Sequence, residues 1–213
     1  MTMRPVENLE PMTLPAPALE GGGTLREALQ MRRTSRGIGD QKISLQALSD
    51  ILWAAQGVNR PQGPFGDLGS TAGSASNSRE IRIYVLVEEG AYLYEPGPHR
   101  LTPVAAGDIR RLAIGRGQQD AGAQAPVRLV YVVDIERFQH AGFPEPGLYD
   151  PEVQKSYYYV DTGLAAQNVY LTAASLGLGA WFHNCDKEAV AQALGLGPDV
   201  RPLFGQTIGY AGE

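Results

Sequence analysis

Apolar residues recur along the chain at spacings that distinguish helical segments from extended ones. Helical spacing is clearest where five apolar residues would share one face: Leu45, Leu48, Ile51, Leu52 and Ala55. Ser44 stands where such a helix is capped, and Gly57 stands where it ends. Thr24 and Glu27 form the signature of a capping box, which predicts a helix through Met31. The pattern predicts further helices over 108–112, 159–176 and 186–194.

Segments rich in β-branched and aromatic residues lie between these helices. They predict strands over 81–87, 92–94, 126–133, 180–182 and 203–209. Residues 88–90 have the composition of a turn, so we expect the first two strands to form a hairpin. Few of the strands stand in simple strand–helix–strand order. We therefore expect an α+β fold, a three-layer sandwich, rather than a doubly wound sheet.

Two segments lack such periodicity. Residues 1–23 contain four prolines and end in Gly21-Gly22-Gly23, which predicts an extended N-terminal arm on a surface or on a partner. Residues 24–213 then form one domain. Within that domain, residues 58–76 are rich in Gly, Pro, Ser and Asn, and predict a long loop of functional or mobile character.

Composition narrows the classes of function. A length of 213 residues and a hydrophobic content of 43% suit one domain with a substantial core. The net charge of −5 argues against nucleic acid or an anionic membrane as the main partner. The single Cys185 excludes an intrachain disulfide, and the three histidines lack the helical pairing of a metal site. Without a signal-like or membrane-spanning apolar run, we expect a soluble cytoplasmic protein.

A basic cluster stands out in this acidic chain. Arg32, Arg33 and Arg36 surround Thr34 and Ser35. Guanidinium forks and hydroxyl donors match the oxygens of a phosphate monoester. Basic residues also gather at helix C-termini, where they offset the macrodipole. On these residues alone, both interpretations stay open.

The longest predicted helix carries polar residues on one of its faces. Asp161, Leu164 and Asn168 lie at positions i, i+3 and i+7 of an otherwise apolar segment. Buried polar groups need hydrogen-bond partners. The partner is the backbone of neighbouring segments, a ligand or a second subunit, and the spacing alone does not choose among them.

The order of several motifs resembles one family. RRTSR is followed by LSDILWAAQGV, then by a Ser-x-x-Asn segment before a strand, then by GQQ ahead of APVRLVYVV, and finally by DTGLAAQNVYLTAASLGLGAW. From about Leu14 to Gly209 this order is similar to that of the FMN-dependent nitroreductase family, most of all to its azoline-oxidase-like branch. The resemblance implies an intertwined homodimer of α+β subunits. Each subunit has a central, mostly antiparallel sheet, and FMN lies at the subunit interface.

The resemblance also implies a set of cofactor-binding residues. The phosphate and ribityl chain would be held by Arg32, Arg33, Thr34 and Arg36. Gln118 would place its amide against the pyrimidine edge of the flavin, where an amide offers both a donor and an acceptor. The backbone of the segment Phe182, His183 and Asn184 would lie near the flavin N5. The His183 side chain is either without a role there or a proton donor.

Other residues would serve the cofactor of the second subunit. The resemblance assigns this role to Ser74, Ala75 and Asn77 of the Ser-x-x-Asn segment, and to Asp161 and Leu164 of the long helix. The chain departs from the family pattern at Arg79-Glu80, where many members have Gln-Pro, and at Gly73, where Pro is common.

The implied activity is an oxidoreductase reaction. NAD(P)H would give a hydride to FMN, which would then reduce a conjugated acceptor such as a nitroaromatic or a quinone. This chemistry needs no metal and no dedicated acid or base, so we assign no catalytic side chain. One alternative is an azoline or peptide dehydrogenase of a peptide-modifying system. For that activity Lys155-Ser156-Tyr157 stands near the place of a Lys-Tyr pair. Another is a flavin-poor binding protein on the same fold, since no basic segment follows Tyr210.

Overall fold

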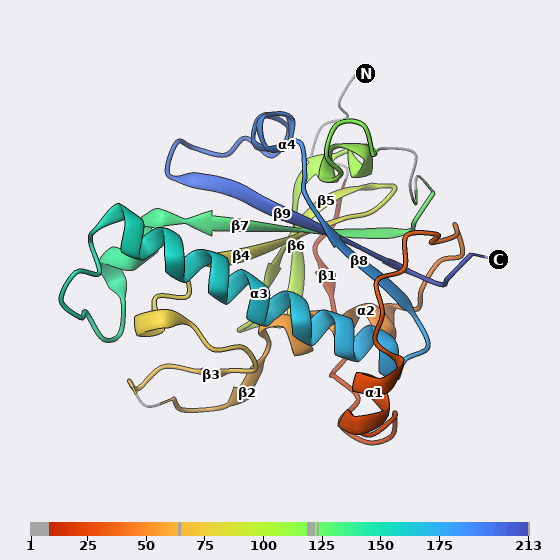
Figure 1. The fold of residues 1–213 in the computed structure, drawn as a ribbon, viewed down its shortest axis with the longest axis horizontal. Helices are drawn as coiled ribbons and strands as arrows, with labels where there is room; N and C mark the ends of the chain where they lie inside the picture. The colour runs from red at the N-terminus through yellow and green to blue at the C-terminus, as the bar shows by residue number, and fades with distance from the viewer. Residues whose placement is uncertain (1–8, 64, 119–121, 123, 213) are drawn as a thin grey trace.

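A seven-stranded sheet forms the centre of the molecule (Figure 1). A computed structural model describes residues 9–63, 65–118, 122 and 124–212. The strand order is β1-β6-β5-β4-β7-β9-β8, and each neighbouring pair is antiparallel. The strands are β1 (Met12–Thr13), β4 (Ile81–Leu86), β5 (Gly90–Glu95), β6 (Arg100–Ala106), β7 (Val127–Asp134), β8 (Gly179–His183) and β9 (Val200–Gly209).

Helices cover both faces of the sheet. On one face lie α1 (Leu25–Met31), α2 (Leu45–Gln56) and α3 (Pro151–Ser175), and on the other lie α4 (Lys187–Ala193) and the short 3-10 helix η3 (Arg110–Ala113). In Figure 1, α4 lies above the sheet and α1 and α2 lie below it. The expected three-layer α+β sandwich with an antiparallel sheet is therefore confirmed.

Strand β7 shows why the layers hold together. All eight of its residues are buried, as the continuous apolar run over 126–133 predicts. Tyr131 faces the larger core on the α2 and α3 side, while Val130 and Val132 face the smaller core under α4. Because both faces of the strand are buried, its sequence is mostly apolar and does not alternate; Arg128 is an exception, and its guanidinium donates to the carbonyls of Arg110 and Gly122.

The predicted helix ends are confirmed where local signals mark them. Thr24 and Glu27 form the capping box of α1, and the Thr24 amide donates to Glu27 at 2.6 Å. The Ser44 hydroxyl accepts from the Ala47 amide at 3.1 Å, and α2 ends before Gly57. Asp186 caps α4 in the same way. These signals are local, so they could be recognised in the sequence.

The helices also differ from the expected ones in four respects. Helix α3 begins at Pro151 rather than at residue 159, because the Asp150 carboxylate caps it by accepting from the Glu152 amide at 2.8 Å. It is not buried all round, since Val160 is 60% exposed and Leu164 is 46% exposed. The segment over 108–112 forms the 3-10 helix η3, and a second 3-10 helix, η4 (Ile135–His140), was not expected.

Besides β1 in the N-terminal arm, two stretches hold strands that the pattern did not predict. Strand β6 contains Pro103, which weakens its signal, and a register shift interrupts its pairing with β5. The predicted loop over 58–76 contains a small hairpin of β2 (Val58–Arg60) and β3 (Gly69–Ser70), followed by the 3-10 helix η2 (Ala75–Asn77).

The described part of the N-terminal arm lies on its own domain. Strand β1 pairs with β6 at the edge of the sheet, and Leu14 is buried behind it. The Ser49 hydroxyl then donates to the Pro15 carbonyl at 2.6 Å. Residues 1–8 lie outside the described part. Along the described ranges, none of the helices has the length and apolar character needed to cross a lipid bilayer.

Candidate functional site

The basic segment lies against strand β8. Thr34 forms an isolated parallel bridge with Ala180, and the Ser35 amide donates to the Ala180 carbonyl at 2.9 Å. Gly179 allows this approach, because a Cβ atom there would lie 3.0 Å from the Ser35 Cβ. The segment therefore continues from α1 along the edge of the sheet instead of ending at the helix.

Tyr170 of α3 joins the basic segment to the strand. Its hydroxyl accepts from the Phe182 amide at 2.7 Å and lies 3.3 Å from the Thr34 hydroxyl. The Arg32 guanidinium lies over the ring of Tyr170, 5.5 Å from its centroid. Sequence analysis did not single out Tyr170, whose partners lie far away in the sequence.

The three arginines of this segment suit an anion. Among the described residues, none of them has a carboxylate within ion-pair distance. Arg33 and Arg36 are exposed, and Arg36 lies 5.7 Å from the Trp181 ring. Arg32 is the C-cap residue of α1 and lies where a cation offsets the helix dipole, whereas Arg36 lies four residues further on and is not explained by that role.

The turn that carries Gln118 is attached to the end of β8. The backbone N–H of Gly115 donates to the Asn184 carbonyl at 2.9 Å, and the backbone N–H of Gln118 donates to the Gly115 carbonyl at 3.1 Å. The Gln118 side chain is exposed. The structure thus brings eight of the predicted residues to one region around β8, namely Arg32, Arg33, Thr34, Arg36, Gln118, Phe182, His183 and Asn184. We call this region the arginine cluster.

The His183 side chain has a structural environment. Its Nε2 lies 2.8 Å from the Thr207 hydroxyl and its Nδ1 lies 2.9 Å from the Asn184 carbonyl. Burial lowers the pKa of His183 to about 4, so the ring is neutral at pH 7. Both ring nitrogens are thus engaged within the chain, which favours a structural role for the His183 side chain.

The remaining predicted residues form a second region around η2. The Asp161 carboxylate accepts from the Ala75 amide at 2.8 Å, and Leu164 lies next to Gly73. The Asn77 side-chain amide donates to Asp67 at 2.8 Å. We call this region the serine loop; the predicted residues in it are Ser74, Ala75, Asn77, Asp161 and Leu164.

Backbone groups of the same chain satisfy the polar face of α3. Asp161 accepts from the Ala75 amide, and the Asn168 side chain donates to the Ala54 carbonyl at 2.9 Å. This is the first of the three kinds of partner that the sequence left open. Leu164, between them, stays exposed.

Glu80 is a buried group that sequence analysis noted only as a departure from the family pattern. Its side chain is fully buried, and Oε2 accepts from the hydroxyls of Ser78 at 2.7 Å and Ser74 at 3.2 Å. Its Oε1 has no partner among the described atoms. Burial, aided by the nearby charge of Asp161, raises the pKa of Glu80 to about 7. Burial also raises the pKa of Asp161.

One chain does not bring the two regions together. Tyr170, which contacts Thr34 and Phe182 of the arginine cluster, lies nine positions after Asp161 of the serine loop. At the rise of an α-helix this separates them by about 13 Å along α3. The two regions therefore lie at different places along α3.

The family comparison agrees with this fold and these motifs. The Nitroreductase family matches residues 29–210, which is most of the chain, and the chain therefore belongs to the nitroreductase family of oxidoreductases. The resemblance stated from the sequence is confirmed at the level of the family. The azoline-oxidase-like branch is not distinguished by this match.

Individual relatives support the same family. A protein of Methanocaldococcus jannaschii described as a nitroreductase is 33% identical over 162 residues, which cover 73% of this chain and 75% of that protein. A crystal structure of a nitroreductase from Ralstonia eutropha is 31% identical, covers all of both chains and has a TM-score of 0.82. A chain of the Escherichia coli microcin synthetase McbBCD complex shares the fold, with a TM-score of 0.71 and 20% identity over 97% of this chain and 80% of that one.

Proposed function

We propose that this protein is an FMN-dependent oxidoreductase that works as a homodimer. The observation that carries the proposal is the arginine cluster, in which three guanidinium groups lack a carboxylate partner among the described residues and lie beside β8. A site with this charge fits a terminal phosphate dianion. Membership of the nitroreductase family, whose members typically bind FMN, supports the choice of FMN.

The residues of the arginine cluster would divide the work of holding FMN. Arg32, Arg33 and Arg36 would bind the phosphate, and the Thr34 hydroxyl would add a donor. The exposed Gln118 amide would meet the pyrimidine edge of the ring system. When bound, FMN would supply the hydride chemistry, with NAD(P)H as the donor and a nitroaromatic or a quinone as the acceptor.

The protein would contribute binding and orientation rather than proton transfer. His183 is neutral and engaged at both ring nitrogens, so it would hold the end of β8 in place. Among the described residues we assign no acid or base to the reaction, and no group of His, Cys, Asp and Glu there could hold a metal ion.

A second subunit would bring the serine loop to the arginine cluster. The exposed apolar side chains on α1 and α3 support such a partner. They are Leu25, Leu29, Met31, Val160 and Leu164. Exposed apolar side chains on two helices offer contact area for a second copy, and a twofold dimer would use the same surface of each subunit.

The structure gives less support to a peptide dehydrogenase of the azoline type. Lys155 pairs with Glu152 at 3.6 Å, while the Tyr157 hydroxyl donates to Glu145 at 2.7 Å. Residues two positions apart on a helix do not face each other. Lys155 and Tyr157 therefore do not form a joint catalytic pair in this arrangement.

The visible absorption spectrum tests the cofactor directly. Purified protein is mixed with FMN, desalted and examined for retained flavin bands. We expect the wild type to retain FMN and Arg36→Ala to weaken its binding by about tenfold or more, because a charged hydrogen bond to phosphate is lost. Arg26→Ala on the exposed side of α1 is the matched control. A folded wild type that retains no FMN would support the flavin-poor binding protein instead.

A further inference from the structure

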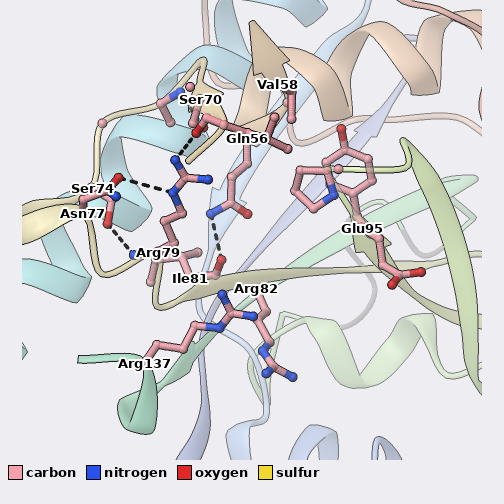
Figure 2. A pocket seen from close by; sticks show the side chains of 18 of the residues that line it. Gln56, Val58, Ser70, Ser74, Asn77, Arg79, Ile81, Arg82, Glu95 and Arg137 are labelled. Carbon is pink, nitrogen blue, oxygen red and sulfur yellow. Dashed lines mark hydrogen bonds between the residues drawn. The ribbon is translucent and has the colours of Figure 1, made fainter. Parts of the chain in front are cut away.

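A large cavity lies outside the arginine cluster (Figure 2). Its volume is about 710 Å³, which is within the range of small-molecule sites. It is lined by the first residues of β4, the last residues of β5 and residues of the hairpin of β2 and β3. Ser74 and Asn77 of the serine loop line one side of it.

Four arginines line this cavity: Arg60, Arg79, Arg82 and Arg137. The one acidic residue in its wall, Glu95, already accepts from Arg100 at 2.6 Å. Asp67 pairs with Arg79 at 2.9 Å, and Asp134 pairs with Arg82 at 2.5 Å. Both of these carboxylates line a neighbouring cavity instead of this one. Arg79, Arg82 and Arg137 also line that neighbouring cavity, so they border both cavities, whereas Arg60 lines only this one of the two.

Two of the arginines have unused capacity to donate hydrogen bonds. Arg82 Nε is buried and has no partner among the described atoms, although a buried donor without a partner is costly. Figure 2 shows Arg82 next to Arg137, and both lie near the Asp134 carboxylate. Arg60 has no ion-pair partner in the described part of the chain.

Part of the remaining wall is apolar. Phe65 and Phe143 stack with their centroids 6.2 Å apart, and they are 48% and 57% exposed. Leu68, at 39% exposed, continues this surface. Exposed aromatic rings beside a group of arginines suit a ligand that has both an apolar body and a negative charge.

We propose that this cavity binds a small organic carboxylate, with its apolar body on the aromatic wall and its carboxylate on the arginines. The cavity is formed by one chain, and its charge does not depend on FMN. Ser74 and Asn77 line the cavity and also belong to the serine loop of the proposed flavin site, so binding has to be measured both without and with FMN.

Titration calorimetry with 2-naphthoate tests the proposal, with 2-naphthamide as the neutral analogue. The protein is used both without FMN and after addition of FMN, so that failure of flavin binding does not affect the result. We expect 2-naphthoate to bind about tenfold more tightly than the amide, because charged hydrogen bonds to guanidinium are strong. Equal affinity of the two compounds, or no binding of either, overturns the proposal.

Substitutions of two cavity arginines test whether 2-naphthoate binds in this cavity. Arg60→Gln removes a cation that has no ion-pair partner among the described residues, so the fold is expected to survive. We expect it and Arg79→Gln each to weaken 2-naphthoate binding about fivefold or more, with Arg26→Gln on α1 unchanged. Unchanged affinity in both cavity variants overturns the location. Inorganic phosphate that competes as tightly as 2-naphthoate overturns the role of the apolar wall.

Discussion

At the scale of single residues, two buried carboxyl groups dominate the serine loop. Glu80 and Asp161 lie close together, and burial raises the pKa of each. Ser74 and Ser78 donate to Glu80, and the Ala75 amide donates to Asp161. The loop is thus held by a carboxyl pair that is more stable with a proton than without one.

The stability of the protein should therefore depend on the ionisation of Glu80. Its pKa rises from an ordinary 4.5 to about 7 on folding, so the folded state binds the proton more tightly. The resulting stability is present below pH 4.5 and is lost as the pH rises to about 7. Glu80→Gln should remove this dependence, because its amide stays neutral and donates to Asp161.

Urea unfolding at pH 5 and pH 8 measures this effect. We expect the wild type to lose about 2.5 kcal/mol between these pH values relative to Glu80→Gln, because the pKa of Glu80 rises from 4.5 to about 7 on folding. The wild type has to be compared with Glu80→Gln because His183, present in both, also makes stability depend on pH. Its pKa is lowered to about 4, so its contribution to stability falls as the pH drops below 6.5, opposite in sign to that of Glu80. Glu20→Gln on the surface is the control. Parallel pH profiles of the wild type and Glu80→Gln would contradict the assignment.

At the scale of elements, local signals could be predicted and remote ones could not. The capping residues Thr24, Ser44 and Asp186 interact with amides three positions away, so the sequence alone contains the signal. Strand β6 depends on pairing with β1 and β5, and Pro103 hides its pattern. Helix α3 starts in a polar segment, which delays the apolar pattern by more than one turn.

The same distinction applies to the site. The arginine cluster is contiguous in the sequence, so its charge could be recognised there. The contact between Thr34 and Tyr170 joins residues 136 positions apart, and that between Ala75 and Asp161 joins residues 86 positions apart. No local pattern marks such contacts, which is why Tyr170 was missed.

The cap of α2 gives a prediction at this scale. Ser44→Ala removes the acceptor for the Ala47 amide and should lower the free energy of unfolding by about 1 kcal/mol. The measurement is urea unfolding at pH 7, with Gln41→Ala in the exposed segment before the helix as the control. A loss no greater than that of the control would show that the cap does not stabilise α2.

At the scale of the whole molecule, the separation of two regions along α3 leads to the proposal of a dimer. The arginine cluster and the serine loop each contain part of the predicted flavin site, and about 13 Å of helix separates them in one chain. The exposed apolar side chains of α1 and α3 offer a surface for a second copy. We therefore propose that two copies of the chain complete each FMN site.

Subunit mixing tests this claim most directly. Arg36→Ala damages the arginine cluster and Asn77→Ala damages the serine loop, so each homodimer should lose FMN. In a mixed dimer one of the two sites combines both undamaged regions. Refolding the variants together at equal amounts should recover about a quarter of the wild-type FMN capacity, since about half of the dimers are mixed. No recovery above that of the separate variants, or FMN binding by a monomer, would contradict a site shared between subunits.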